Sequence, residues 1–296
     1  MVTRHSIATR LGLALLAIAV YVGVQASALA QDRNGTLGRI ADSGEMRIGY
    51  RTDARPLSFE DEDGQPAGYV VDMCRDIATA VEAELGRDDI QIRWVPVTTE
   101  NRLRAVVDGD IDIECGSTTI TIRRMQSVDF TLMTFVTGGT VLSRADNAIR
   151  LTEDLAGKSV AVIRNTSTSE GLNAWLAKNL VDAEVVDVAD RAEGMEKLRS
   201  GEVDGFASDQ IVLIGEVMEM EDPEDYAISQ ELFSYEPYAL MVRRDDAAFR
   251  LVANRALAQI FRSGQYIDIF NRWVGWAGIR PSRTLVDLYG VQQLPE

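Results

Sequence analysis

The sequence predicts an α/β fold of two similar lobes, each a mainly parallel sheet flanked by helices. Short apolar runs of strand character alternate with segments of helical period along most of the chain, which is typical of α/β proteins. Two stretches, RLRAVVDGDIDIECGS (102–117) and GMEKLRSGEVDGFASD (194–209), share the pattern of a helix, a terminating glycine and a new strand. Gly109 and Gly201 fit a helix C-cap, where a left-handed conformation costs glycine little. The repeat indicates one such unit in each half of the chain.

The expected elements alternate through both halves. Strands are expected where aliphatic and β-branched residues form short runs, at 46–50, 90–97, 111–115, 159–164, 183–188 and 203–208. Helical periodicity is clearest at 70–85, 169–180 and 247–273. Ligands of such sheets usually bind beyond the carboxyl ends of the strands, so the turns that follow the strands are the places to examine.

Two extended segments indicate how the chain passes between the lobes. TFVTGGTVLSRAD (134–146) leads directly into the second unit, and SYEPYALMVRRDD (234–246) precedes the last helical region. If that region packs on the first lobe, the chain crosses twice, which makes a hinge and a cleft suited to a small ligand. The expected divisions are a signal peptide of 1–30, an N-terminal segment of 31–43, a first lobe of 44–138 plus 239–296, and a second lobe of 139–238.

The first thirty residues have the three parts of a secretory signal. Two arginines precede the apolar run LGLALLAIAVYVGV (11–24), and the small-residue stretch QASALA (25–30) follows it. Its last three residues match an A-x-A cleavage site, and no basic cluster comes after them. The alternative is a membrane anchor, because 11–30 is just long enough to span a bilayer. We expect cleavage near Ala30 and a soluble, exported mature protein.

Composition excludes several classes of function. The net charge of −16 repels polyanions, so nucleic acids and acidic membrane surfaces are poor partners. The one histidine, His5, lies in the predicted signal, so the mature chain lacks a Ser-His-Asp or Cys-His mechanism and a histidine metal site. We expect neither a metal nor a cofactor.

The stretch ECGSTTITIRR (114–124) places a hydroxyl-rich turn directly after a predicted strand. Backbone N–H groups and hydroxyls in the turn could hold an anion, and a following arginine could make a bidentate pair with a carboxylate. The alternative is a helix start capped by a threonine, with the arginines on a solvated face.

A second turn, RNTSTSEGL (164–172), has the same position in the other lobe. Ser167 and Glu170 have capping-box spacing, and a helix N-terminus has spare donors that favour an anion. A well-capped helix without a ligand is the alternative. Because the two turns match in position, they would face each other across the cleft.

Four further charges stand at strand-to-helix junctions, namely Arg51, Arg102, Arg191 and Asp209. Each alone is more often a surface charge. Gathered in one cleft, they could bind an anion that also carries one positive group.

These motifs resemble a known family. ECGSTT with Arg124, VTTENR (97–102), NTSTSE (165–170) and GYVVDMCRDIA (68–78) are similar to the bacterial periplasmic solute-binding proteins, family 3, of polar amino-acid ABC importers, and most of all to the glutamate/aspartate-binding branch. The similarity covers about 44–275, although Val70 stands where an acidic residue is common. It implies the two-lobe periplasmic-binding-protein fold of type II, with two crossing strands.

The resemblance implies a clamp for the part common to all α-amino acids. Arg124, Thr119 and Thr168 would hold the α-carboxylate. Asp209 and the backbone at Ser117 would take the α-ammonium.

A second group would bind the side-chain carboxylate, namely Arg51, Thr99 and Arg102. Arg191 stands where proteins of this branch commonly have a histidine that helps to bind the side-chain carboxylate. This replacement strengthens the case for an acidic ligand and could shift the preference between aspartate and glutamate.

Two departures bear on the clamp. Ile120 and Arg123 stand where the family commonly has Asn and Glu. Because Arg123 and Arg124 are adjacent, either could be the arginine that binds the α-carboxylate. The spacing from Ser117 matches the family for Arg124.

The cysteines Cys74 and Cys115 would be exported, which favours disulfides, but the residues alone permit a bridge or two buried thiols. In the family that the chain resembles, cysteines at both positions occur together, which implies a bridge from the helix to the ligand-binding strand.

The resemblance therefore implies a periplasmic receptor, not an enzyme, that closes on glutamate or aspartate and delivers it to an ABC permease in the inner membrane. Such receptors are usually monomers. A ligand with fewer negative groups would leave an arginine unmatched, which is costly when buried. Two alternatives remain: a dehydratase of the prephenate/arogenate type on the same fold, with Glu114 or Asp209 as acid or base, and a ligand-sensing partner of a signalling receptor.

Overall fold

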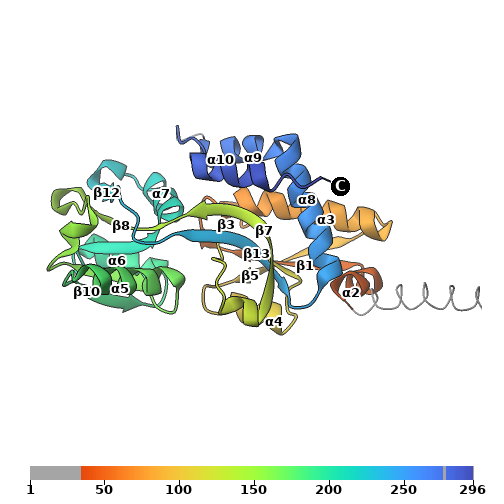
Figure 1. The fold of residues 1–296 in the computed structure, drawn as a ribbon, viewed down its shortest axis with the longest axis horizontal. Helices are drawn as coiled ribbons and strands as arrows, with labels where there is room; N and C mark the ends of the chain where they lie inside the picture. The colour runs from red at the N-terminus through yellow and green to blue at the C-terminus, as the bar shows by residue number, and fades with distance from the viewer. Residues whose placement is uncertain (1–34, 276–277, 296) are drawn as a thin grey trace, which may run out of the picture.

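The computed structural model describes residues 35–275 and 278–295, which form two sheet-and-helix units joined by two long strands lying side by side (Figure 1). The predicted signal peptide lies outside the described residues. Within those ranges, no helix is long and apolar enough to cross a membrane. The predicted α/β class and the two crossing strands are confirmed.

The first sheet has the strand order β5-β1-β6-β13-β7. Four strands run in one direction, and β13 runs against both of its neighbours. The strands are β1 (Glu45–Arg51), β5 (Gln91–Val97), β6 (Ile113–Cys115), β7 (Val128–Thr137) and β13 (Glu236–Arg243). The large core on one face includes side chains of α3 (Tyr69–Leu85) and α8 (Ala247–Ser263), while α4 (Arg102–Val107) packs on the other face.

The second sheet repeats this plan with the order β10-β9-β11-β8-β12, in which β8 is the strand that runs against the rest. Its strands are β8 (Gly139–Arg144), β9 (Ser159–Ile163), β10 (Glu184–Val188), β11 (Gly205–Asp209) and β12 (Tyr226–Ile228). Side chains of α5 (Ser167–Asn179) pack on one face, and those of α6 (Arg191–Ser200) and α7 (Gln210–Met218) on the other. The internal repeat therefore corresponds to two sheets of matching topology.

Some elements were not predicted from the sequence. They are α2 (Thr36–Ser43), a small antiparallel sheet of β2 (Asp53–Ala54), β3 (Ser58–Glu60) and β4 (Pro66–Ala67), the helices α7 and α10 (Arg283–Val291), and the short strand β12. The predicted helical region 247–273 is two helices, because Gly264 with φ 79° ends α8 before α9 (Gln265–Trp273) begins.

The passage from β7 to β8 contains two glycines, Gly138 between the strands and Gly139 at the start of β8. A Cβ atom at Gly138 would lie 2.4 Å from the Ser234 carbonyl oxygen, and one at Gly139 would lie 2.4 Å from the Phe233 ring. The segment leading into β13 therefore passes closer to these two positions than any larger residue permits.

Cys74 of α3 and Cys115 of β6 form a disulfide with a Cα–Cα distance of 6.4 Å. The bridge implied by the family resemblance is present. It attaches a long helix to the strand that leads into the hydroxyl-rich turn.

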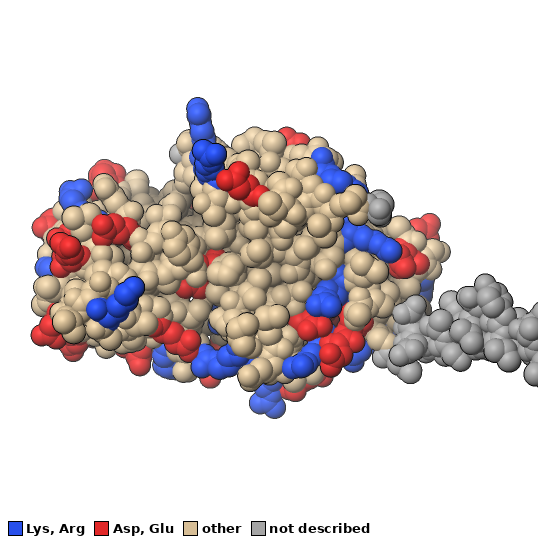
Figure 2. Space-filling view, in the orientation of Figure 1, with Lys and Arg blue, Asp and Glu red and all other residues tan. Residues whose placement is uncertain are grey.

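Acidic and basic side chains are interspersed on the face seen in Figure 2. The excess of acidic residues is not gathered into one patch on this face, so it identifies no docking surface there.

Candidate ligand-binding site

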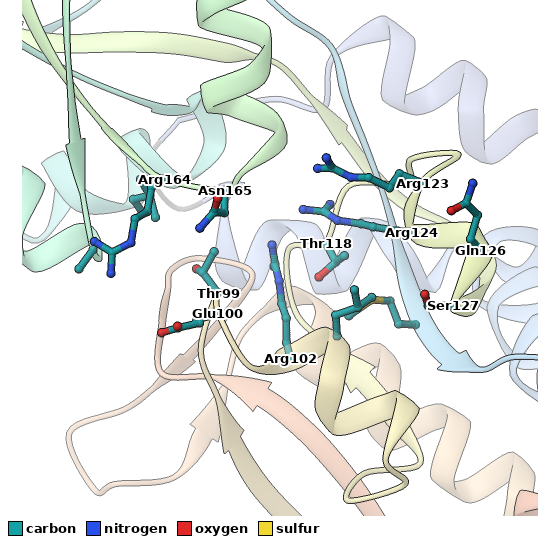
Figure 3. Close-up of a pocket in the computed structure, with 14 residues that line it drawn as sticks. Thr99, Glu100, Arg102, Thr118, Arg123, Arg124, Gln126, Ser127, Arg164 and Asn165 are labelled. Carbon is teal, nitrogen blue, oxygen red and sulfur yellow. The ribbon is translucent and has the colours of Figure 1, made fainter.

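The carboxyl ends of strands from both sheets meet across a cleft between the two units. A cavity of about 30 Å³ lies at its centre. Eight of the nine predicted site residues line this cavity: Arg51, Thr99, Arg102, Ser117, Thr119, Thr168, Arg191 and Asp209. The ninth, Arg124, lines an adjoining cavity of about 370 Å³ together with Thr99 and Arg102 (Figure 3). The structure thus brings all nine predicted residues to one cleft.

The hydroxyl-rich turn lines the cleft and is not the start of an α-helix. It is held to β13 by two backbone hydrogen bonds, in which Ile120 N donates to the Pro237 carbonyl at 2.8 Å and Ala239 N to the Thr118 carbonyl at 3.2 Å. Only a one-turn 3-10 helix, η1 (Arg124–Gln126), follows. These two bonds to β13 fix the position of the turn relative to this strand.

Two arginines are anchored to this turn through its backbone carbonyls. Arg102 Nη1 donates to the Ser117 carbonyl at 3.2 Å, and Arg124 Nη1 donates to the Thr119 carbonyl at 2.6 Å. Neither arginine has a carboxylate within ion-pair distance among the described residues. Figure 3 shows both guanidinium groups pointing into the same space. These two charges are available for anionic groups of a ligand.

The structure separates Arg123 from Arg124. Arg123 Nη2 donates to Glu170 Oε1 of α5 at 2.5 Å, and both side chains are largely exposed. Arg124 is partly buried and bonded to the turn. Both arginines line the adjoining cavity (Figure 3), but Arg123 is largely exposed and paired with the second unit, whereas Arg124 is more buried and has no carboxylate partner among the described residues.

The predicted capping box at Ser167 and Glu170 is wrong by one residue. Asn165 adopts a positive φ of 60°, which leaves Thr166 extended as the N-cap of α5, and its hydroxyl accepts from Ser169 N at 3.0 Å. Glu170 is consequently free to pair with Arg123. The sequence pattern located the start of α5 correctly but assigned the N-cap to Ser167 instead of Thr166.

Hydroxyl groups at the start of α5 form hydrogen bonds with residues of both units. Ser167 Oγ donates to Thr119 Oγ1 at 3.1 Å, and Thr119 Oγ1 donates to Glu236 Oε2 at 2.7 Å. Thr168 Oγ1 donates to Asp209 Oδ1 at 2.8 Å. The two turns predicted to face each other are therefore in direct contact.

Asp209 has a second partner that sequence reasoning missed. The Tyr238 hydroxyl of β13 donates to Asp209 Oδ2. Burial, with the Asp209 charge adding to it, raises the pKa of the Tyr238 hydroxyl well above its usual value, so this hydroxyl stays protonated. Each carboxylate oxygen of Asp209 retains acceptor capacity for a cationic group.

Arg51 and Arg191 lie on opposite sides of the cleft and meet at Asp53. Arg51 Nη2 pairs with Asp53 Oδ1 at 2.5 Å, and Arg191 Nη1 donates to the Asp53 carbonyl at 2.6 Å. Arg191 also pairs with Glu216 at 3.5 Å. Burial, with Arg102 next in effect, lowers the pKa of Arg51 to about 10. The Nε atoms of both arginines are buried without a hydrogen-bond partner among the described residues, so each retains a donor.

Of the two candidate acids or bases, only Asp209 lines the central cavity. The linings of the central and adjoining cavities, as far as the chain is described, do not include Glu114. No group of three or more His, Cys, Asp or Glu side chains within the described residues could hold a metal ion.

Two facing α/β units joined by paired crossing strands, with a polar cleft between them, define a two-lobed solute-binding protein. A model of the bacterial extracellular solute-binding proteins, family 3, matches residues 46–276, and the chain belongs to this family.

Two relatives and two solved structures give the context. The chain is 32% identical to an L-glutamate/L-aspartate-binding protein of Pseudomonas aeruginosa over 89% of this chain and 88% of the relative. It is 30% identical to a glutamate/aspartate import solute-binding protein of Escherichia coli, over 88% and 86%. An ancestral arginine-binding protein bound to glutamine superimposes with a TM-score of 0.68 at 27% identity, covering 78% of this chain and 98% of that one. An ancestral amino-acid-binding protein described as a precursor of cyclohexadienyl dehydratase gives 0.69 at 26%, covering 81% and 99%.

Proposed function

We propose that this protein is the periplasmic receptor of an amino-acid ABC importer and that it binds L-glutamate or L-aspartate in the cleft. One observation carries the proposal. Arg102 and Arg124 have no carboxylate partner in the described chain and face the same cleft as Asp209. An acidic amino acid has two carboxylates and one ammonium group, which match these three charges in number and sign. The names of the two curated relatives agree with this ligand class.

The part common to all amino acids would bind at the turn of the first lobe and at the start of α5. Arg124, Thr119 and Thr168 would hold the α-carboxylate, and Asp209 with the Ser117 backbone would hold the ammonium. Thr119 and Ser167 now bond to each other, so a bound carboxylate would exchange this contact for hydrogen bonds to the ligand.

The side-chain carboxylate would bind at Arg102, supported by Thr99 and Arg51. Arg51 already pairs with Asp53, so it contributes its remaining donors rather than a whole free charge. Arg191 would help from the second lobe, although Asp53 and Glu216 compete for it. A neutral ligand side chain at Arg102 would leave this buried cation without a carboxylate at hydrogen-bonding distance.

Ligand entry into the central cavity would require the lobes to separate. A cavity of about 30 Å³ has the volume of about one water molecule. Ion pairs join the two lobes, among them Arg123–Glu170 and Arg55–Glu219. We take the lobes as 44–138 plus 239–296 and 139–238, so that β7 and β13 are the hinge.

The protein would act as a monomer, exported by a signal cleaved near Ala30, and would present the closed lobes to a permease in the inner membrane. It would carry out no reaction on its ligand. A dehydratase function remains the alternative, because Asp209 lines the cleft and one structural neighbour is described as a dehydratase precursor.

Isothermal titration of the ligand-stripped mature protein tests the proposal. L-Glutamate, L-aspartate, L-glutamine, L-arginine and prephenate would be titrated separately. We expect binding of glutamate or aspartate at roughly micromolar affinity, which corresponds to about 8 kcal/mol. Heat with arginine or glutamine and none with either acidic amino acid would contradict the ligand class. Turnover of prephenate would favour the dehydratase.

A further inference from the structure

Glu114, in the middle of β6, is a buried carboxylate outside the set of predicted ligand contacts. Its side chain is 0% exposed and folds back over the following turn. A Cβ atom at Gly116 would lie 2.1 Å from Glu114 Oε1 and 3.0 Å from Arg51 Cγ. Thr118 is close by, yet neither its hydroxyl nor either Glu114 oxygen makes a hydrogen bond of normal geometry to a described residue. The carboxylate is thus enclosed without the bonds that would ordinarily compensate its burial.

Positive charge reaches Glu114 from three elements. Arg51 ends β1, Arg102 begins α4 and Arg124 begins η1. The neighbour across β13 is Met241, which carries no charge. Glu114 forms no ion pair within 4.0 Å in the described chain, so the attraction acts at longer range.

For Arg102 and Arg124, Glu114 is the largest source of compensating negative charge. Burial lowers the pKa of both arginines, and the Glu114 carboxylate leads the groups that oppose this effect. Neither arginine forms an ion pair within 4.0 Å among the described residues. Without a ligand, the negative charge of Glu114 therefore offsets part of the positive charge of these two arginines.

An acidic ligand would disturb this balance. Its two carboxylates would neutralise Arg102 and Arg124 at hydrogen-bonding distance, so Glu114 would lose its compensating charges. A buried anion without partners is costly and usually becomes protonated. Burial already raises the pKa of Glu114, and Arg102 is the main group that opposes the rise.

We propose that Glu114 is an internal counter-anion of Arg102 and Arg124, and that its carboxylate takes up a proton from solvent when an acidic amino acid binds. This inference rests on the proposed function. The bound form then holds more protons than the free form, so affinity increases as pH falls. The effect lies above the ordinary Glu pKa of 4.5, because burial raises the pKa in the folded protein.

Titration calorimetry of L-glutamate in buffers of different ionisation enthalpy, between about pH 5.5 and pH 8, counts the protons taken up. For the wild-type protein we expect an uptake that approaches one proton. The dissociation constant should rise by up to about tenfold per pH unit where uptake is complete. Glu114→Gln carries a fixed neutral side chain of nearly the same shape. It should take up no proton and keep, at every pH, the affinity that wild type reaches at acid pH.

Asp112→Asn is the matched control. Asp112 is also buried and directly precedes β6, but it pairs with Arg39 and Arg47 away from the cleft. This variant should retain the proton uptake of the wild-type protein.

The outcomes separate the two proposals. If wild type gives no heat with either acidic amino acid, the proposed function fails. If glutamate binds without proton uptake, or if Glu114→Gln keeps the uptake, only the role of Glu114 is wrong. Equal weakening by Glu114→Gln at every pH would also overturn it, since that result indicates a purely structural side chain.

Discussion

Gly215→Ala should weaken ligand binding although residue 215 does not line the ligand cavities. Gly215 lies on α7 in the second lobe and faces the loop after β2 in the first lobe. A Cβ atom there would lie 2.3 Å from the Arg55 carbonyl oxygen, 2.7 Å from the Arg55 carbonyl carbon and 3.0 Å from Pro56 Cδ. Because two of these atoms are backbone, no side-chain rotation relieves the clash. The lobes would have to separate.

The size of the effect follows from the cost of overpacking. Inserting a methyl group into a filled contact costs about 1–3 kcal/mol. If this cost falls on the closed state alone, the dissociation constant rises by about 5-fold to 150-fold. Stability of the second lobe should stay the same or increase, since alanine favours a helix interior by about 1 kcal/mol over glycine. Affinity and stability thus change in opposite directions.

Calorimetry gives the affinity, and small-angle X-ray scattering with saturating glutamate gives the shape. Gly290→Ala is the matched control, because Gly290 also lies in a helix and a Cβ atom there meets nothing within 4 Å. Unchanged affinity in Gly215→Ala, with the same compaction as wild type, would refute the view that the contact of α7 with Arg55 belongs to the ligand-bound state.

Four further variants test separate features of the structure. Arg124→Ala should weaken every amino acid ligand by at least about 30-fold, whereas Arg102→Ala should weaken acidic ligands selectively; equal effects on acidic and neutral ligands in calorimetry would contradict this division. Arg123→Ala removes an exposed ion pair worth at most about 1 kcal/mol, so affinity should fall less than about fivefold, and a larger loss would identify Arg123 as the clamp. Replacing Cys74 and Cys115 by alanine opens a bridge across a separation of 41 residues and should cost about 4 kcal/mol in urea unfolding; a loss below 1 kcal/mol would contradict this estimate.

The sequence predicted most elements of both sheets because their signals are local. Alternating apolar runs and terminating glycines are visible within a few residues, and the strands expected at 46–50 and 159–164 lie within one residue of β1 and β9. The break of the last helical region at Gly264 was also a local signal, but the helical period on both sides concealed it. The short strands β2 to β4 and the helices α2 and α10 carried weaker patterns and were missed.

The site was predictable where residues follow strands, and less so where distant segments meet. Tyr238 and Glu236 lie on β13, more than a hundred residues beyond the turn that they contact through Thr119. No spacing rule connects positions so far apart, so their roles at Asp209 and Thr119 required the structure. The cap of α5 was misplaced for a different reason: Asn165 takes a left-handed conformation, which moves the N-cap to Thr166.

The ratio of the dissociation constants for L-glutamate and L-glutamine tests whether the cleft selects an acidic amino acid. The two ligands have nearly the same shape and differ by one negative charge, which is the charge assigned to Arg102. We expect glutamine to bind at least about 30-fold more weakly, because its amide leaves the Arg102 guanidinium without a carboxylate at hydrogen-bonding distance. Equal affinities, or a preference for glutamine, would contradict the assignment of this cleft to an acidic amino acid.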